Sequence, residues 1–247
     1  MSDPDGVTLA ARVRRLEISP TVAMAQKAGA LKASGVRVYN FPVGEPDQPT
    51  PPSIVQAAYE AMKAGRTRYT PAAGLTELRE AVAERYRKDW GASFSPEQVT
   101  ITVGGKQALA LLYVALLDRG SEVLVPSPHW PTFAEAARIA GGKATLIPLS
   151  ERGGFRLTAR AVKKALGPRT RAVLVNSPSN PTGAVVAPEE LVAIARLARR
   201  AGIFLIFDDT YGHLIFRKGG GPDLDAMAAA AGDRLVVIGT MSKTYCM

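Results

Sequence analysis

The sequence predicts an α/β fold, with a mostly parallel sheet and helices on both of its faces. From Val99 onward, short runs rich in β-branched residues alternate with amphipathic segments of helical period. Nearly continuous apolar strands of this kind are typical of sheets that are buried on both faces. The chain has 247 residues, close to the size at which one hydrophobic core stops growing. We therefore expect one large domain, or one domain with part of another.

The N-terminal region has a different pattern. It begins with a helix, continues through a short strand within "VYNFPVGEPDQPTPP", and includes a proline-rich link at residues 42–52. Two amphipathic helices follow, in "PSIVQAAYEAMKAG" and "LTELREAVAERYRKDWG". We place the domain boundary in the link. Residues 1–45 are then an N-terminal arm with the first part of a small domain, and residues 46–247 are the large domain.

The rest of the chain alternates strands with helices. Helices are expected in "KQALALLYVALL", "TARAVKKAL" and "PEELVAIARLARRA", the last of which opens with a proline suited to a first helical turn. Because parallel strands present their carboxyl ends at one edge of the sheet, we expect functional residues there. The predicted strands are residues 99–103, 122–126, 144–149, 172–176, 204–208 and 235–239.

The net charge of +9 raises the question of nucleic-acid binding. Small basic groups such as "RVRR", "RYRK" and "ARRA" are scattered along the chain, and they do not alternate with aromatic residues as a stacking platform requires. The pattern therefore favours solvated helix faces over a nucleic-acid surface. Part of the positive charge can also serve anionic small molecules.

Composition excludes several other classes. The sequence has no apolar run long enough to span a membrane, and "MSDPDGVTLAARVRR" lacks an apolar signal core. One cysteine excludes an internal disulfide framework, and with two histidines it leaves too little for a zinc site. We expect no membrane segment, no metal and a cytoplasmic location.

The first predicted strand is followed by "VGGKQAL", in which two glycines lead into a helix. Backbone amides at a helix N-terminus attract phosphate, and Lys106 adds a positive charge beside Gly104 and Gly105. A tight turn is the alternative explanation. The stretch is not a P-loop, because Thr100 and Gln107 stand where that motif requires glycine and Ser/Thr.

Two further strand ends offer an aromatic ring and an amide. "PSPHWPTF" places Trp130 where a flat ligand could stack on it, although a tryptophan in such a place is more often a core residue. "NSPSNPTG" places Asn180 in a loop that two prolines and a glycine keep irregular and stiff. A stiff loop can be a simple turn, or it can aim the Asn180 amide at a ligand.

The last two strand ends supply ionisable groups. Asp208 ends an otherwise apolar strand, where a carboxylate is costly to desolvate unless a cation faces it. Tyr211 follows three residues later, and Asp209 can be explained as a helix cap. Lys243 lies just after the sixth strand and can form a Schiff base with an aldehyde. A phosphorylated pyridine aldehyde, pyridoxal 5′-phosphate (PLP), would use all of these groups together.

The motifs "GEPD", "YTPAAGLTELREAVA", "GGKQAL", "NSPSNPTG", "DDTY" and "SKTYCM", in this order, resemble the class I/II aminotransferases of PLP fold type I. The branch most similar is that of the bacterial aspartate aminotransferases, and the resemblance extends from about residue 11 to residue 247. It implies that Lys243 is the Schiff-base lysine and Asp208 the partner of the pyridine nitrogen. It also implies that Asn180 and Tyr211 contact the phenolic oxygen.

The resemblance assigns further residues to the phosphate, the ring and the substrate. Gly104, Gly105, Lys106, Thr240 and Ser242 match phosphate-site positions. Trp130 matches the ring-stacking position and, with Asn180 and Gly44, contributes to substrate binding. Tyr69 matches a tyrosine that in this family reaches the phosphate of the neighbouring subunit, so a homodimer is implied.

The resemblance implies transamination between an amino acid, with aspartate as a candidate, and a 2-oxo acid. Two alternatives stay open: another fold-type-I PLP reaction (a lyase, a decarboxylase or a cyclopropane-forming enzyme), or an inactive remnant that only binds a ligand. In relatives, a "TGWRIGY"-like strand and a C-terminal domain carry two ligand-binding arginines after the lysine. This sequence stops at Met247. We therefore expect a truncated large domain with an incomplete sheet, weak cofactor binding and little or no turnover.

Overall fold

The computed structural model describes residues 9–14, 16, 20–39, 44–216 and 220–247. The chain divides into two units, Met1–Pro49 and Thr50–Met247. In the first, the described elements are helices α1 (Ala11–Arg14) and α2 (Pro20–Ala33). Residues 36–39 form no strand, and the rest of the short strand predicted there lies outside the described residues. The assignment of residues 1–45 to an arm and part of a small domain stays a prediction.

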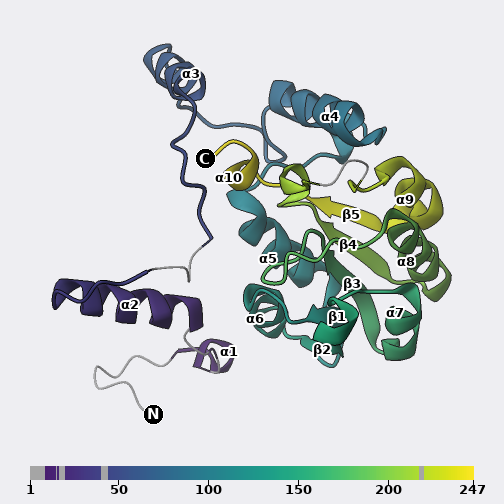
Figure 1. The fold of residues 1–247 in the computed structure, drawn as a ribbon. Helices are drawn as coiled ribbons and strands as arrows, with labels where there is room; N and C mark the ends of the chain where they lie inside the picture. The colour runs from purple at the N-terminus through teal and green to yellow at the C-terminus, as the bar shows by residue number, and fades with distance from the viewer. Residues whose placement is uncertain (1–8, 15, 17–19, 40–43, 217–219) are drawn as a thin grey trace. The chain divides into compact units, whose positions relative to one another are not determined.

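The second unit is built on a parallel sheet (Figure 1). Within the described residues its strand order is β2-β1-β3-β4-β5, and neighbouring strands are parallel. The fold class predicted from the sequence is confirmed. The strands are β1 (Glu122–Ser127), β2 (Lys143–Pro148), β3 (Thr170–Asn176), β4 (Phe204–Asp208) and β5 (Leu235–Ile238).

The helices of the second unit begin and end where local signals predict. Pro188 occupies the first turn of α8, and Gly202, in the left-handed region at φ 69°, ends it. The Thr158 hydroxyl accepts a hydrogen bond from the amide of Ala161 and caps α7. The α-helices are α3 (Pro52–Lys63), α4 (Thr76–Trp90), α5 (Gly104–Leu116), α6 (Thr132–Ile139), α7 (Ala159–Ala165), α8 (Pro188–Ala201), α9 (Leu224–Ala231) and α10 (Met241–Thr244). Short 3₁₀ turns are η1 (Pro96–Gln98), η2 (Glu151–Gly153), η3 (Gly212–Leu214) and η4 (Gly232–Arg234).

Each face of the sheet has its own apolar core. Alternate strand residues such as Leu205 and Phe207 belong to a cluster with residues of α8 and α9, whereas Ile206, between them, belongs to a cluster with residues of α5 and α6. This alternation follows from the pleat, which points successive side chains to opposite faces. The sheet is therefore a buried central layer, and its edges and strand ends remain for function.

One predicted strand is wrong. Residues 99–103 form no strand, and the Ile101 amide donates instead to the Ala73 carbonyl at 2.9 Å. Val103 is 86% exposed. β-branched residues favour an extended backbone, but a strand also needs a neighbour for its amides and carbonyls. No described strand pairs with this segment, so the sheet of the described residues has five strands rather than the six predicted.

The strand order creates a crevice at the carboxyl end of the sheet. The chain runs from β1 outward to β2 and then returns to place β3 on the other side of β1. At such a reversal the loops that follow the two central strands diverge, and a ligand can enter between them. The structure has a pocket there, and its lining includes Pro126, Pro128, His129, Asn176, Ser179 and Asn180.

Candidate active site

The ends of β3, β4 and β5 are aligned. Asn176 pairs with Asp208, and Asp208 pairs with Ile238. The residues that follow these three positions therefore leave the sheet at one level. Asn180, Asp208 and Tyr211 lie on these strand ends or on the turns that follow them, and Lys243 lies on the short helix α10 after β5.

The N-terminus of α5 lies against the start of α10. Gly104 has φ +77°, in the left-handed region, and no side chain caps the helix. A Cβ added to Gly105 would lie 3.4 Å from Ile238 Cγ2 and 3.9 Å from Thr240 Cβ. The first turn of α5 therefore reaches the end of β5. An uncapped helix N-terminus beside a hydroxyl-bearing turn is a suitable place for an anion.

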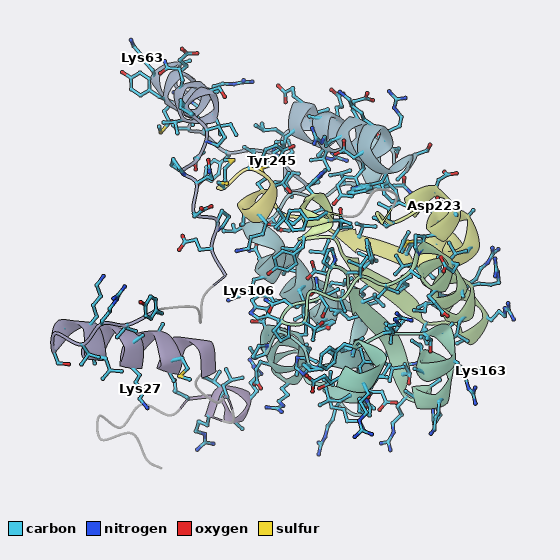
Figure 2. The ribbon with its side chains drawn as sticks, in the orientation of Figure 1. Lys27, Lys63, Lys106, Lys163, Asp223 and Tyr245 are labelled. Atoms are coloured by element: carbon cyan, nitrogen blue, oxygen red, sulfur yellow. The ribbon has the colours of Figure 1, made fainter. Side chains whose placement is uncertain are left out.

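Lys106, labelled in Figure 2, extends from this same turn. Its Nζ lies 5.2 Å from the centroid of the Trp130 ring, within the range of a cation–π contact. Trp130 also meets the Phe133 ring edge to face at 5.4 Å and packs against the core formed with α5 and α6. Trp130 therefore packs partly against the core and contacts a candidate phosphate residue, and its role in stacking on a ligand stays a prediction.

A chain of hydrogen bonds joins the loop after β3 to the turn after β4. The Asn180 amide Nδ2 donates to the Tyr211 hydroxyl at 3.2 Å, and the Asn180 backbone amide donates to Asn176 Oδ1 at 2.8 Å. Asn176 Nδ2 donates in turn to the Asp208 carbonyl at 3.3 Å. Burial raises the pKa of Tyr211 against the lowering effect of the Asn180 hydrogen bond. The amide and the phenol are thus held side by side.

Asp208 is a buried carboxylate at the level of this pair. It is 7% exposed, and its Oδ1 accepts a hydrogen bond from the Thr210 amide at 3.0 Å. Burial raises its pKa, although hydrogen bonding to Thr210 opposes the rise. A carboxylate whose charge is disfavoured by desolvation gains most from a cationic or proton-donating ligand.

Lys243 lies on the short helix α10, which directly follows β5. The Thr240 hydroxyl oxygen accepts a hydrogen bond from the Ser242 amide at 3.2 Å and donates to the Ser242 hydroxyl at 3.1 Å. The two hydroxyls of this turn therefore lie together, and Thr240 faces the first turn of α5. This arrangement brings the predicted phosphate residues together and holds the lysine segment next to them.

Two further predicted residues belong to other segments of the chain. Tyr69 is fully exposed, at 107% of its reference area, and its role toward a neighbouring subunit stays a prediction. Gly44 belongs to the N-terminal unit, so its place in a substrate site also stays a prediction. Among the described residues there is no cluster of three or more His, Cys, Asp or Glu side chains suited to a metal ion, and none of the described helices has the length and apolarity to cross a membrane.

Sequence reasoning missed three residues beside the site. Asp209 does not cap a helix: it is 6% exposed, and its carboxylate interacts with Tyr86 and Trp90 of α4, which lower its pKa. The two consecutive aspartates at the end of an apolar strand were a signal that both carboxylates enter the fold. Tyr86 and Trp90 gave no such signal, because aromatic residues on an amphipathic helix are usually core residues.

Comparison with known proteins identifies the family of this chain. The family model described as aminotransferase class I and II matches residues 36–247. The chain belongs to the class I and II aminotransferase family. It is 45% identical over 208 residues to the aspartate/prephenate aminotransferase of Thermus thermophilus, covering 84% of this chain and 54% of that relative. It is 37% identical over 239 residues to the aspartate aminotransferase of Geobacillus stearothermophilus, covering 97% of this chain and 61% of that relative.

Solved structures of aminotransferases share the fold. The aspartate aminotransferase from Thermus thermophilus with maleate superposes with a TM-score of 0.92 at 40% identity, covering 98% of this chain and 62% of that structure. The aspartate aminotransferase from Rhizobium meliloti superposes with a TM-score of 0.92 at 33% identity, covering 98% and 61%. This aminotransferase chain thus spans less than two thirds of the length of the relatives that it matches.

Proposed function

We propose that this aminotransferase chain carries the cofactor site of a PLP-dependent enzyme that moves an amino group between an amino acid and a 2-oxo acid. The observation that carries the proposal is the convergence of Lys243, Asp208 and the Asn180–Tyr211 pair on the aligned ends of β3, β4 and β5. The names of the relatives support an acidic amino acid such as aspartate as the substrate.

The described residues fit this cofactor part by part. The uncapped first turn of α5, with Lys106 and the hydroxyls of Thr240 and Ser242, fits a phosphate group. The buried Asp208 carboxylate fits a protonated ring nitrogen, because an opposite charge would offset its desolvation. The paired Asn180 amide and Tyr211 phenol fit a phenolic oxygen.

When bound, PLP supplies a carbonyl that condenses with amines and a ring that stabilises negative charge on the neighbouring carbon. Lys243 would provide the amine that holds the cofactor and would move a proton at the substrate α-carbon. Asp208 would keep the ring nitrogen protonated. Asn180 and Tyr211 would donate hydrogen bonds to the phenolic oxygen, and Trp130 would cover a face of the ring. A homodimer and a cytoplasmic location, both expected from the sequence, belong to the same proposal.

Trapping of the attachment tests this function. The purified chain is incubated with PLP and reduced with borohydride, and the modified lysine is identified by peptide mass spectrometry. We expect one modification per chain, at Lys243. Lys243→Ala should abolish it, whereas Lys163→Ala, on an exposed lysine of α7 (Figure 2), should leave it unchanged. Modification spread over surface lysines without preference for Lys243 would contradict the cofactor site.

Transamination is tested separately, with aspartate and 2-oxoglutarate as the paired substrates. Amino transfer that depends on the 2-oxo acid is the expected result. Release of stoichiometric ammonia in the absence of the 2-oxo acid would replace transamination with a lyase reaction on the same cofactor.

A further inference from the structure

A second group of polar side chains lies outside the cofactor site, between α4 and the end of β4. Its centre is Asp209, which directly follows Asp208 and is 6% exposed. Tyr86 and Trp90 of α4 interact with its carboxylate and lower its pKa, while its Oδ1 atom has no hydrogen-bond partner among the described residues. A buried carboxylate that is incompletely paired destabilises a fold compared with an apolar side chain of similar size. Its presence here therefore calls for a role other than packing.

The backbone of Asp209 ties two site-bearing segments together. Its amide donates to the Ile238 carbonyl at 2.9 Å, at the last residue of β5. Its carbonyl accepts a hydrogen bond from the Gly212 amide at 3.1 Å and so closes the turn that contains Tyr211. Any displacement of Asp209 would therefore move the turn with Asp208 and Tyr211 relative to the end of β5.

Tyr86 lies between the same two segments. A Cβ added to Gly239, the residue before Thr240, would lie 2.2 Å from the Tyr86 hydroxyl oxygen. A Cβ added to Gly212 would lie 2.1 Å from Asp209 Oδ1 and 3.0 Å from Trp90 Cζ2. Only glycine leaves room at these two positions, so the two turns close directly on the side chains of Tyr86, Trp90 and Asp209.

Each element packed against Asp209 contributes an ionisable side chain to its surroundings. Asp208 precedes it on β4, α4 contributes Asp89 besides Tyr86, and η3 contributes His213, whose Nε2 lies 3.3 Å from Asp89 Oδ2. Burial, together with Asp208 and Asp89, raises the pKa of Asp209 to about 7, against the lowering effect of Tyr86 and Trp90. The carboxylate therefore changes charge near neutral pH, one residue away from Asp208.

We propose that Asp209, held by Tyr86, is a positioning residue that sets the relative placement of Asp208 and the Lys243 segment. The inference rests on the proposed PLP site and adds to it a residue pair that touches neither the cofactor nor the substrate. In this arrangement Tyr86 holds the Asp209 carboxylate, and Asp209 holds the turn after β4. Because the Asp209 amide bonds to the Ile238 carbonyl, the same residue also determines where β5 ends and α10 begins.

The test compares Tyr86→Phe and Asp209→Asn with the matched controls Tyr59→Phe and Asp233→Asn, both at exposed positions. Binding of PLP is titrated by absorbance at pH 6 and pH 8, and circular dichroism establishes that each variant is folded. We expect both test variants to bind PLP about tenfold more weakly at pH 8, while the controls bind as the wild type does. A loss of about tenfold is typical when a side chain that orients a metal ligand is removed, and we expect the same scale for a side chain that orients cofactor-binding residues.

The pH profile separates positioning from simple packing. Below pH 7 the wild-type Asp209 is itself protonated, so the defect of Asp209→Asn should be smaller at pH 6 than at pH 8. Tyr86→Phe removes the hydroxyl that lowers the pKa of Asp209, so its pH profile should move to higher pH. Defects of equal size at the two pH values, or affinities equal to those of the controls, would overturn the inference.

The outcomes also distinguish this inference from the proposed function. If the wild-type chain does not attach PLP at Lys243, both are overturned. If it attaches PLP and the two test variants behave as the controls, only the positioning role is lost. If Asp209→Asn does not fold, Tyr86→Phe, which removes a single hydroxyl, decides the question by the same two measurements.

Discussion

Buried carboxylates lie at both ends of the sheet, and the two ends treat them differently. At the amino end, Glu122 accepts hydrogen bonds from the Thr145 and Thr170 hydroxyls at 2.7 and 2.9 Å and pairs with Lys143 at 3.3 Å. Hydrogen bonding, chiefly from Thr145, lowers its pKa. At the carboxyl end, burial raises the pKa of both Asp208 and Asp209.

The contrast separates a structural carboxylate from two that can act on a ligand. Around Glu122 the fold supplies the hydrogen-bond partners that the charged carboxylate requires, so a cationic ligand would add little stabilisation there. Around Asp208 desolvation prevails, and the remaining interaction energy is available to a cationic group. Variants at the two ends of the sheet test whether the ends differ in this way.

The largest effect is expected from Asp208→Asn in the PLP-loaded chain. An amide cannot keep a ring nitrogen protonated, so the rate of the first amino transfer from aspartate should fall about 1,000-fold. This is the middle of the range by which a positioned acid or base typically accelerates a reaction. The melting temperature should change little, because the Asn amide oxygen can still accept from Thr210. Single-turnover absorbance measures the rate, with Asp233→Asn as the control. A rate within a few fold of wild type would remove Asp208 from the role assigned to it.

Asp209→Asn should change the pH dependence of stability. A carboxylate whose folded pKa is raised contributes stability that is present below its unfolded pKa of 3.8 and is lost as pH rises through about 7. Since one pKa unit corresponds to about 1.4 kcal/mol, the wild type should lose roughly 3 kcal/mol more than the variant between pH 5 and pH 8. Urea unfolding at several pH values measures the difference. Parallel curves for the two proteins would show that Asp209 does not titrate in this range.

Glu122→Gln should have the opposite pH dependence. The folded pKa of Glu122 is lowered, so its contribution is present above the unfolded pKa of 4.5 and is lost as pH falls through the folded value. Loss of charge-assisted hydrogen bonds should cost about 2 kcal/mol at pH 7, and PLP affinity should be unchanged. The measurements are urea unfolding at pH 7 and pH 4 and a PLP titration. Weakened PLP binding with unchanged stability would mean that the two ends of the sheet are not separate in function.

The features that the sequence predicts correctly depend on local order along the chain. The apolar runs of β1 to β5 and the position of Asp208 at a strand end are read directly from the sequence, because strand ends of a parallel sheet meet at one edge. The strand predicted at residues 99–103 fails since pairing depends on a distant neighbour that local propensity does not report.

Contacts across the fold could not be predicted in the same way. Tyr86 and Asp209 are separated by more than a hundred positions in the chain, and nothing in the period of α4 distinguishes a tyrosine that partners a carboxylate from one that fills the core. Glu122, Thr145 and Thr170 likewise meet only because β1 lies between β2 and β3. Strand order, which single-sequence patterns leave open, decides the Glu122 cluster, and the placement of α4 decides the Tyr86–Asp209 pair.

The smallest effect is expected at Tyr113, which offers a direct contrast with Tyr86. Tyr113 of α5 is fully buried, and its hydroxyl has no hydrogen-bond partner among the described residues. Burial and, secondarily, Asp208 raise its pKa. A buried hydroxyl without a partner carries a desolvation cost, so Tyr113→Phe should stabilise the chain by about 1 kcal/mol with unchanged PLP affinity. Tyr86→Phe, which removes an equally small group, should instead weaken PLP binding. Urea unfolding and PLP titration of the two variants make the comparison. If Tyr113→Phe weakens PLP binding as Tyr86→Phe does, the Tyr113 hydroxyl contributes to PLP binding beside Asp208. The site then extends to the opposite face of the sheet.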